Sequence, residues 1–237
     1  MTNQILYEDN HLLIVNKQPG DIVQGDKTGD EPLVETLKSY LKEKYHKPGE
    51  VFLGVVHRLD RPVSGAVVFA RTSKALARMN AMLRKREVKK VYWAVCGRQS
   101  AVGSKQPAVC SLQSILITHF LSRNEKQNKS YAYDLPGEGR QRAELLYRVI
   151  AQGDRYDLLE VELLTGRHHQ IRAQLAAIGR PIKGDLKYGA PRSNPDGSIS
   201  LHSRMVEFVH PVSKAPVSIT APLPEEGIWK KLARDIV

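Results

Sequence analysis

Apolar and polar residues alternate over several short segments, a pattern typical of β-strands in which one face is buried. The first two segments lie on either side of the turn residues Asp9 and Asn10 and predict a β-hairpin that ends at Pro19-Gly20. Further strands are predicted at residues 51–56, 66–70, 88–95, 112–120, 143–149, 156–164, 201–209 and 216–221. Residues 122–130 are polar and charged and are expected to be exposed.

Helical spacing of apolar residues is found in four other places. The predicted helices begin after Pro32, at Ser73, at Arg167 and near Ile228, and the third is closed by Gly179. Strands outnumber helices and most neighbouring strands have short links, so the expected fold class is α+β. We expect a large mixed, mainly antiparallel β-sheet flanked by helices. The sequence shows no linker between domains, which predicts one domain over residues 1–237.

Composition is that of a soluble globular protein, with 41% apolar and 26% charged residues among 237. The longest apolar runs are far shorter than the ~18 residues of a membrane span, and the N-terminal segment has no basic region typical of a signal peptide. Two cysteines, Cys96 and Cys110, are too few for a disulfide framework. We therefore expect a cytoplasmic protein without a membrane span.

The net charge of the protein limits the kinds of molecule that it is expected to bind. The formal net charge is +11, and the excess is spread along the chain. Such a field favours a polyanion, either nucleic acid or an acidic membrane surface. A basic surface that only binds water is the alternative.

The segment 57–65 lies between two predicted strands, where a loop is held at both ends. It places Asp60 between Arg58 and Arg61. Nearby guanidinium groups keep a carboxylate ionised, and an ionised, positioned aspartate can act as nucleophile or base. The alternative is a surface turn with an ion pair.

Two more segments carry candidate chemistry. Arg172 flanks the apolar stripe of its predicted helix, so it could point inward and need a buried partner. Adjacent histidines, His168 and His169, point ~100° apart on a helix and do not suit one metal ion, so no metal site is predicted. Tyr92 follows two lysines and could stack on a nucleobase or be a half-buried strand residue.

Taken together, these segments resemble the RluA-type family of RNA pseudouridine synthases from Ile5 to about Pro222. The resemblance rests on a series of short motifs, whose order and spacing match: Glu8-Asp9, Asn16-Lys17, Pro19-Gly20, His57-Arg58-Leu59-Asp60, Ser64-Gly65, Lys90-Val91-Tyr92, Ala94-Val95, Ala143 with Tyr147, Thr165-Gly166-Arg167, His169-Gln170-Ile171-Arg172, Gly184-Asp185, Tyr188-Gly189, Leu201-His202 and His210-Pro211.

The resemblance implies an isomerase that converts uridine in RNA to pseudouridine, with the target base flipped out of its stack. Asp60 matches the catalytic aspartate, which attacks C6 of the base or acts at the ribose. Arg172 matches the arginine that pairs with this aspartate, Tyr92 the tyrosine that stacks on the target base, and Arg58 an arginine that holds the base out. Further base or RNA contacts are expected from Arg61, Arg167, His169 and Gln170. The reaction is redox-neutral, so no cofactor is implied.

The chain departs from the family pattern at Val63, where threonine is usual, and at Gln174, where histidine is frequent. Only four residues precede Ile5, so we expect a form without an N-terminal S4 RNA-binding domain. RNA selection would then rest on the basic residues of 84–90 and 123–129. The expected substrate is a stem-loop of ribosomal or transfer RNA, bound by a monomer.

Two other functions are compatible with the sequence. One is a non-catalytic RNA-binding or RNA-remodelling protein that kept the fold. The other is a metal-dependent RNA hydrolase that uses His57, Asp60 and His168.

Overall fold

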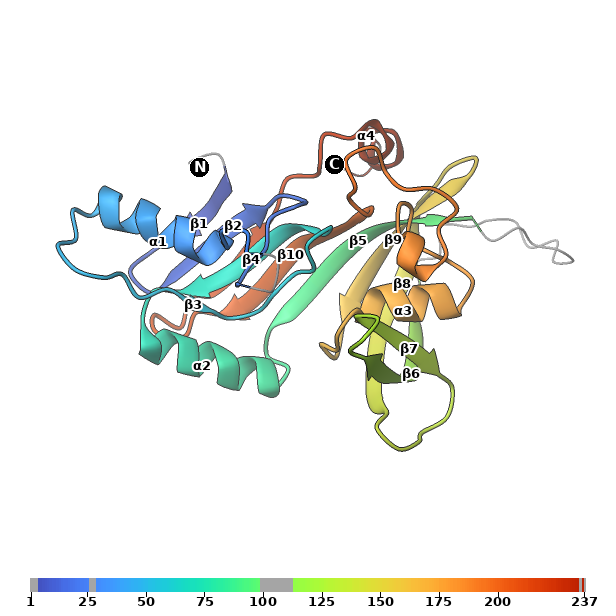
Figure 1. The fold of residues 1–237 in the computed structure, drawn as a ribbon, viewed down its shortest axis with the longest axis horizontal. Coiled ribbons are helices and arrows are strands. Elements are labelled where there is room, and N and C mark those ends of the chain that lie inside the picture. The colour runs from blue at the N-terminus through green and yellow to red at the C-terminus, as the bar shows by residue number, and fades with distance from the viewer. Residues whose placement is uncertain (1–3, 26–28, 99–112, 235, 237) are drawn as a thin grey trace, which may run out of the picture. The chain divides into compact units, whose positions relative to one another are not determined.

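The computed structural model describes residues 4–25, 29–98, 113–234 and 236. These residues form two compact units, shown in Figure 1. Unit 1 comprises Met1–Lys90 with Ser203–Pro222, and unit 2 comprises Val91–His202 with Leu223–Val237. Cys110 and the start of the predicted strand 112–120 lie outside the described residues.

The strands of unit 1 have the order β1-β2-β4-β10, with β3 beside β4 and β11 beside β10. Their bounds are Ile5–Glu8 (β1), Leu12–Lys17 (β2), Gly54–Val55 (β3), Ser64–Ala70 (β4), Leu201–Val209 (β10) and Pro216–Thr220 (β11). The predicted hairpin is confirmed, because β1 and β2 pair antiparallel. β2 also pairs antiparallel with β4, and both strands are buried on both faces.

Two helices accompany these strands, α1 (Leu33–Lys44) and α2 (Ser73–Arg84). Met79 of α2 is 0% exposed and packs with Leu12 and Ile14 of β2 in one apolar cluster. The α2 helix is capped by Thr72, whose side chain accepts a hydrogen bond from the Ala75 N–H at 3.1 Å. The predicted cap, Ser73, is instead the first residue of the helix, since the extended backbone that a cap requires occurs at Thr72.

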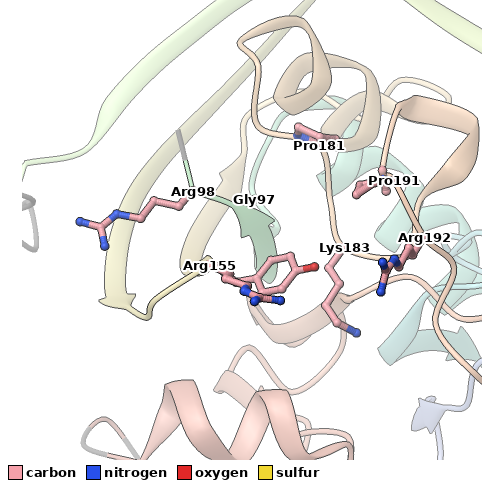
Figure 2. Close-up of a pocket in the computed structure, with 10 residues that line it drawn as sticks. Gly97, Arg98, Arg155, Pro181, Lys183, Pro191 and Arg192 are labelled. Carbon is pink, nitrogen blue, oxygen red and sulfur yellow. The ribbon is translucent and has the colours of Figure 1, made fainter. Parts of the chain in front are cut away.

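Unit 2 contains the strand order β5-β9-β8-β6-β7. The elements are β5 (Lys89–Gly97), β6 (Ile115–Asn124), β7 (Lys129–Tyr133), β8 (Gln141–Gln152), β9 (Tyr156–Leu163), α3 (Gln170–Ala177), a short 3-10 helix (Leu186–Tyr188) and α4 (Gly227–Ala233). The pairs β5–β9, β8–β9, β6–β8 and β6–β7 are all antiparallel. Strands that pair antiparallel and are flanked by helices confirm the predicted α+β class. A cavity also opens on this unit (Figure 2).

Three predicted elements differ from the structure. The strand expected at 51–56 is only Gly54–Val55, because just these two residues pair with β4. In the segment 122–130, residue 123 and residues 125–128 are exposed as expected, but the segment also includes the end of β6 and the start of β7, and Ser130 is 2% exposed. Backbone pairing between the two strands requires no apolar side chains, so the polar sequence did not reveal it. The helix expected from Arg167 begins at Gln170, after His169 with φ 51°.

In the ranges that the structure describes, no helix is long and apolar enough to cross a membrane. The prediction of a single domain over 1–237 stays a prediction.

Candidate active site

The Asp60 loop of unit 1 is a tight turn anchored by apolar residues on both sides. Leu59 is 8% exposed and Val63 is 2% exposed, whereas Asp60 between them is half-buried and Arg58 is exposed. The Val63 N–H donates to the Asp60 carbonyl at 3.0 Å and closes the turn. β4 begins at the next residue, so a buried strand fixes the end of the loop. The carboxylate is therefore held at the protein surface by a rigid backbone.

A buried lysine at the end of β2 is hydrogen-bonded to the backbone of the Asp60 loop. Lys17 is 0% exposed, and its Nζ donates to three carbonyl oxygens: Gln18 at 2.9 Å, Arg61 at 3.0 Å and Val63 at 2.7 Å. Burial lowers the pKa of Lys17 to about 8, although the charges of Asp21 and Asp60 oppose the shift. The ammonium thus connects the end of β2 to the part of the loop that follows Asp60, and its charge acts on that carboxylate.

The second residue of β4 has to be a glycine. Gly65 has φ +113°, and a Cβ atom built on it would lie 2.3 Å from the backbone oxygen of Ser203 on β10. The side chain of Ser203 in turn donates to the Ala66 carbonyl at 3.1 Å. This close approach explains why the loop motif ends in Ser64-Gly65.

The other polar residues of the loop have structural partners. Arg61 forms an exposed ion pair with Asp30 at 2.8 Å. The predicted alternative, an ion pair at a surface turn, therefore applies to Arg61. His57 accepts a hydrogen bond at Nε2 from the Val68 N–H at 3.2 Å. Burial and the nearby charge of Lys90 lower the pKa of His57 to about 3, so its ring is neutral.

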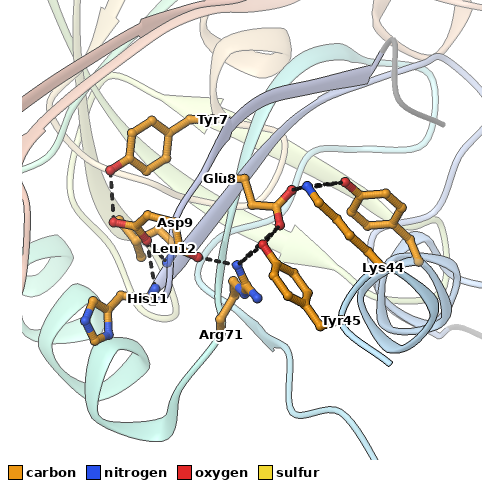
Figure 3. A network of polar contacts seen from close by, with 9 residues as sticks. Tyr7, Glu8, Asp9, His11, Leu12, Lys44, Tyr45 and Arg71 are labelled. Carbon is orange, nitrogen blue, oxygen red and sulfur yellow. Dashed lines mark hydrogen bonds and ion pairs between the residues drawn. The ribbon is translucent and has the colours of Figure 1, made fainter. Parts of the chain in front are cut away.

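The Glu8-Asp9 motif stabilises the opening hairpin (Figure 3). Glu8 accepts hydrogen bonds from Tyr40 at 3.1 Å, Lys44 at 2.8 Å, Tyr45 at 2.6 Å and Arg71 at 3.3 Å. Burial raises the pKa of Glu8, but the bonds from Lys44 and the two tyrosines outweigh burial and leave the pKa below its ordinary value. The carboxylate joins β1 to α1 and takes no part in the Asp60 loop.

Asp9 closes the turn between β1 and β2. Its Oδ1 accepts from the backbone N–H groups of His11 and Leu12, both at 2.7 Å, and its Oδ2 accepts from Tyr7 at 2.9 Å. His210 of the His210-Pro211 motif approaches the same carboxylate at 2.9 Å. These motif residues are therefore part of the scaffold of unit 1.

The centre of the unit 2 site is a buried ion pair between α3 and the segment before the 3-10 helix. Arg172 is 5% exposed and donates from Nε to Asp185 Oδ2 at 2.7 Å and from Nη2 to Oδ1 at 2.9 Å. Asp185 is 1% exposed. The sequence-based expectation that Arg172 points inward toward a buried partner is confirmed, and one such partner is Asp185. Its expected pairing with Asp60, a residue of unit 1, stays a prediction.

Hydrogen bonding fixes the tautomer of His169, which lies beside this ion pair. The guanidinium of Arg172 can only donate, so His169 Nε2, 3.1 Å from Nη1, accepts. The proton of the neutral ring is then on Nδ1, which donates to the Tyr188 hydroxyl at 3.0 Å. That hydroxyl also accepts from the Ser130 N–H at 2.8 Å. Arg172 lies over the Tyr188 ring, 5.0 Å from its centroid. Asp185, Arg172, His169 and Tyr188 are thus joined by hydrogen bonds into one cluster of side chains.

Gln170 connects the turn before α3 to β8. Its Oε1 accepts from the Thr165 hydroxyl at 2.8 Å and from the Arg167 N–H at 2.9 Å, and its Nε2 donates to the Glu144 carbonyl at 3.0 Å. The Arg167 side chain is exposed. Gln170 thus fixes the turn, and the exposed Arg167 side chain donates from Nε to the Arg142 carbonyl at 3.3 Å.

Tyr92 lies in β5, opposite Val161 of β9. It is 6% exposed, and its neighbours Val91 and Trp93 are similarly buried. Both faces of β5 are therefore covered, where the sequence left half-burial or exposure for base stacking as alternatives.

The structure gathers Arg58, Asp60 and Arg61 in one loop of unit 1, and Arg167, His169, Gln170 and Arg172 at the start of α3 in unit 2. Tyr92 belongs to unit 2 as well. Lys17, Asp185 and Tyr188 were quoted only as parts of motifs and are now seen to hold the loop and Arg172. Across the described ranges, no group of three His, Cys, Asp or Glu side chains is arranged to hold a metal ion.

Comparison with known proteins gives a consistent set of matches. The sequence model of the family described as RNA pseudouridylate synthase matches residues 11–177. The uncharacterized RNA pseudouridine synthase YhcT of Bacillus subtilis is 33% identical over 97% of this chain and 71% of its own length. Ribosomal large subunit pseudouridine synthase C of Escherichia coli is 30% identical over 99% of this chain and 70% of its own length.

Ribosomal large subunit pseudouridine synthase D of Xylella fastidiosa is 32% identical over 94% of this chain and 66% of its own length. The chain thus spans about two thirds of these curated relatives. Among solved structures, human RNA pseudouridylate synthase domain containing 4 superposes with a TM-score of 0.76 at 22% identity. That match covers 96% of this chain and 91% of the human chain.

Proposed function

Because this chain belongs to the RNA pseudouridylate synthase family, we propose that it isomerises specific uridines in structured ribosomal or transfer RNA with Asp60 as the catalytic carboxylate. The family match confirms the resemblance that the motifs predicted, and the enzyme class is an RNA pseudouridine synthase, an isomerase acting on uridine in RNA. The names of two relatives refer to the large ribosomal subunit, which favours ribosomal RNA as the substrate.

The observation that supports Asp60 is its anchored, half-buried position. Its turn is closed by its own carbonyl, tied to β2 through Lys17 and followed at once by a buried strand. Catalytic groups need to be held in productive geometry by residues that are themselves packed. A surface turn that only formed an ion pair would not need a buried ammonium beneath it.

In the proposed reaction the N1–C1′ bond of uridine breaks, the uracil turns, and C5 bonds to C1′. C5 then loses its proton and N1 gains one, so the product has the same atoms as uridine. No net oxidation occurs, so no redox cofactor is proposed. Asp60 attacks either C6 of the base or the ribose, Tyr92 stacks on the base, and Arg172 orients the aspartate. Arg58, exposed at the rim of the loop, holds the flipped base out of its stack.

The remaining predicted residues take two kinds of role in this proposal. Arg61 and Arg167 are exposed cations that contact the RNA backbone. His169 and Gln170 are positioning residues, because their ring nitrogens and amide are already hydrogen-bonded within the protein. We further propose that residues 1–237 act as one catalytic domain and as a monomer.

The test is a map of pseudouridine across stable RNA from cells with the wild-type gene, with the gene deleted, and with Asp60→Asn. Asn keeps the shape of the side chain and removes its charge. Asp134→Asn, which changes an exposed carboxylate of unit 2, is the control. We expect the same sites to disappear in the deletion and in Asp60→Asn and to persist in Asp134→Asn. In vitro, the rate for Asp60→Asn should fall by about 10²–10⁴-fold, the scale of a lost acid–base or nucleophilic group.

Sites that persist in Asp60→Asn would refute the role of Asp60. If no site changed even in the deletion strain, the protein would not be acting on stable RNA. The alternative of an RNA-binding protein that retains the fold would then be favoured.

A further inference from the structure

Unit 2 contains a cavity of about 180 Å³, and none of the residues that line it is assigned to catalysis above. Four of the residues that line it are cationic: Arg98, Arg155, Lys183 and Arg192. Its apolar surface comes from Tyr156 and from prolines and glycines. In Figure 2 the charged ends of Lys183 and Arg192 point the same way, with that of Arg155 near them in the view, whereas Arg98 points elsewhere. Neither Tyr92 nor Arg172 of unit 2 is among the lining residues.

Lys183 is held in a fixed position in the cavity wall. Its Nζ donates to Asn194 Oδ1 at 2.6 Å and to Glu226 Oε1 at 2.7 Å. Asn194 is 3% exposed and is itself bonded through Nδ2 to Ser198 and Ser200, both at 3.2 Å. An ammonium has three N–H donors, so one remains to reach a ligand. Glu226 offsets the charge of Lys183 but not that of the arginines.

Packing under the cavity is tight. A Cβ atom on Gly184, which has φ +88°, would lie 2.7 Å from the Ser198 carbonyl oxygen and 2.8 Å from Cγ of Asn194. Position 184 therefore accepts no side chain, and the backbone next to Lys183 packs closely against Asn194. A site held in this way is pre-organised, which reduces the entropy lost when a ligand binds.

Several other arginines in the described part of the chain pair with a carboxylate, whereas two of the cavity arginines do not. Arg71, Arg142, Arg148, Arg172 and Arg180 all have a carboxylate partner. Within the described ranges, neither Arg155 nor Arg192 pairs with a carboxylate, although both line the same hollow and are exposed. Two unpaired guanidinium groups beside a fixed ammonium suit a ligand that carries its own negative charge.

We propose that this cavity binds a phosphate group of an RNA strand, as a second contact outside the catalytic residues. Guanidinium groups match the oxygen geometry of a phosphate, and the ammonium adds a point charge. Tyr156 and the prolines offer an apolar wall to the adjoining sugar or base. The choice of RNA as the source of the phosphate rests on the proposed function.

The backbone connects this cavity to the unit 2 site. Lys183 and Gly184 line the cavity, and the next residue, Asp185, holds Arg172. The Lys183 N–H also donates to the Val95 carbonyl at 2.8 Å, on the strand that carries Tyr92. A strand bound in the cavity would thus be held by the same segment that positions Arg172.

The test compares two double variants that each remove two exposed positive charges. Arg155→Ala/Arg192→Ala alters the cavity, and Lys42→Ala/Lys47→Ala alters the exposed surface at the end of α1 and is the matched control. The probe is a fluorescent oligouridylate of about 12 nucleotides. Its affinity is measured by fluorescence anisotropy between about 0.05 and 0.2 M salt. Thermal unfolding confirms that both variants fold.

For a single strand, each phosphate contact contributes about 0.7 to the slope of log affinity against log salt. The cavity variant should therefore lose about 0.7 of this slope, because the cavity holds one phosphate, with affinity about 5-fold lower or more at 0.1 M salt. In the control variant, the losses in salt slope and in affinity should each be less than half of those in the cavity variant. If both variants changed equally, the effect would be one of net charge, and the proposal would be overturned.

A second titration distinguishes the source of the phosphate. Uridine 5′-monophosphate is titrated into the wild type and the cavity variant by calorimetry. Binding of the nucleotide that is lost in the variant, with oligouridylate binding unchanged, would assign the cavity to a free nucleotide and overturn the RNA contact. Binding is measured without turnover, so a wild type that made no pseudouridine would refute the proposed function but not the cavity.

Discussion

Replacing Lys17 by methionine separates the stability of the fold from the order of the Asp60 loop. Methionine has a similar length and no charge, so the change removes the three hydrogen bonds from Nζ and keeps most of the packing. The Arg61 carbonyl retains a bond from the Gly20 N–H at 2.9 Å. The buried Val63 carbonyl keeps no other donor among the described residues.

Two opposing contributions to stability nearly cancel. Burial of the ammonium lowers its pKa from 10.5 to about 8, which costs the folded state about 3 kcal/mol at neutral pH, and methionine removes this cost. Against it stand the unsatisfied Val63 carbonyl, at about 1–3 kcal/mol, and the lost charged hydrogen bonds. The free energy of unfolding at pH 7 should therefore change by no more than about 2 kcal/mol. Enzymatic activity should fall by about 10²-fold, because displacing a catalytic group by about 1 Å lowers the reaction rate by about that factor.

The pH dependence gives the sharper test. The pKa of Lys17 is about 8 in the folded chain and about 10.4 in the unfolded chain, so between these values the unfolded chain binds more protons. Stability from this group then rises with pH. The wild type should gain about 3 kcal/mol relative to Lys17→Met between pH 7 and about pH 10.5. Urea unfolding followed by circular dichroism at a series of pH values measures this difference.

Lys47→Met, at an exposed lysine, is the control, and its stability should stay parallel to that of the wild type over the same pH range. A difference between the wild type and Lys17→Met that stayed flat or shrank with rising pH would refute the account of the buried ammonium. Wild-type activity in Lys17→Met would refute its role in holding the loop.

Two further predictions concern the scaffold of unit 1. Glu8→Gln should lower the free energy of unfolding at pH 7 by about 1–3 kcal/mol, because buried charge-assisted hydrogen bonds are lost. Since the pKa of Glu8 is lowered on folding, its contribution is present above about pH 4.3 and is lost as pH falls through the folded value, so urea unfolding at pH 3 should bring the two proteins closer. Gly65→Ala should cost at least about 3 kcal/mol in thermal unfolding, because a left-handed backbone and a clash with Ser203 add together. The control Gly139→Ala, also at positive φ but in open space, should cost only about 1 kcal/mol, and equal losses would contradict the clash.

Local sequence patterns predicted those elements whose burial and periodicity agree. The hairpin of β1 and β2 and the pair β8–β9 were predicted because apolar alternation and turn residues mark both their strands and their connections. β7 was missed because it is only five residues long and begins inside a charged segment, although it contains Tyr131, Ala132 and Tyr133. The start of α3 was placed three residues early because the turn before it depends on the side chain of Gln170.

In the candidate site, too, the sequence predicts some features and not others. A sequence can show that Arg172 flanks an apolar stripe, and burial then requires an anionic partner. It cannot show that the partner is Asp185, because that contact depends on the path of the chain between the two residues. Lys17 is harder still. A lysine at the end of an apolar strand is usually exposed, and only the loop packed over it makes it an internal donor.

The edge of the strand order in unit 2 has a consequence for the protein at high concentration. β7 is the last strand of that order, and Tyr131 and Tyr133 on it are each 37% exposed. Lys129 lies over the ring of Tyr131, 5.3 Å from its centroid, and Arg140 lies over that of Tyr133 at 3.7 Å. An edge strand is a template for pairing with another copy of the same chain, which is a route to aggregation. A second copy that paired with β7 would bring its own Lys129 and Arg140 close to Lys129 and Arg140 of the first. Repulsion between these like charges therefore protects the edge strand. The positive charge that attracts a polyanion thereby also keeps copies of the chain apart, and that protection weakens as salt screens it.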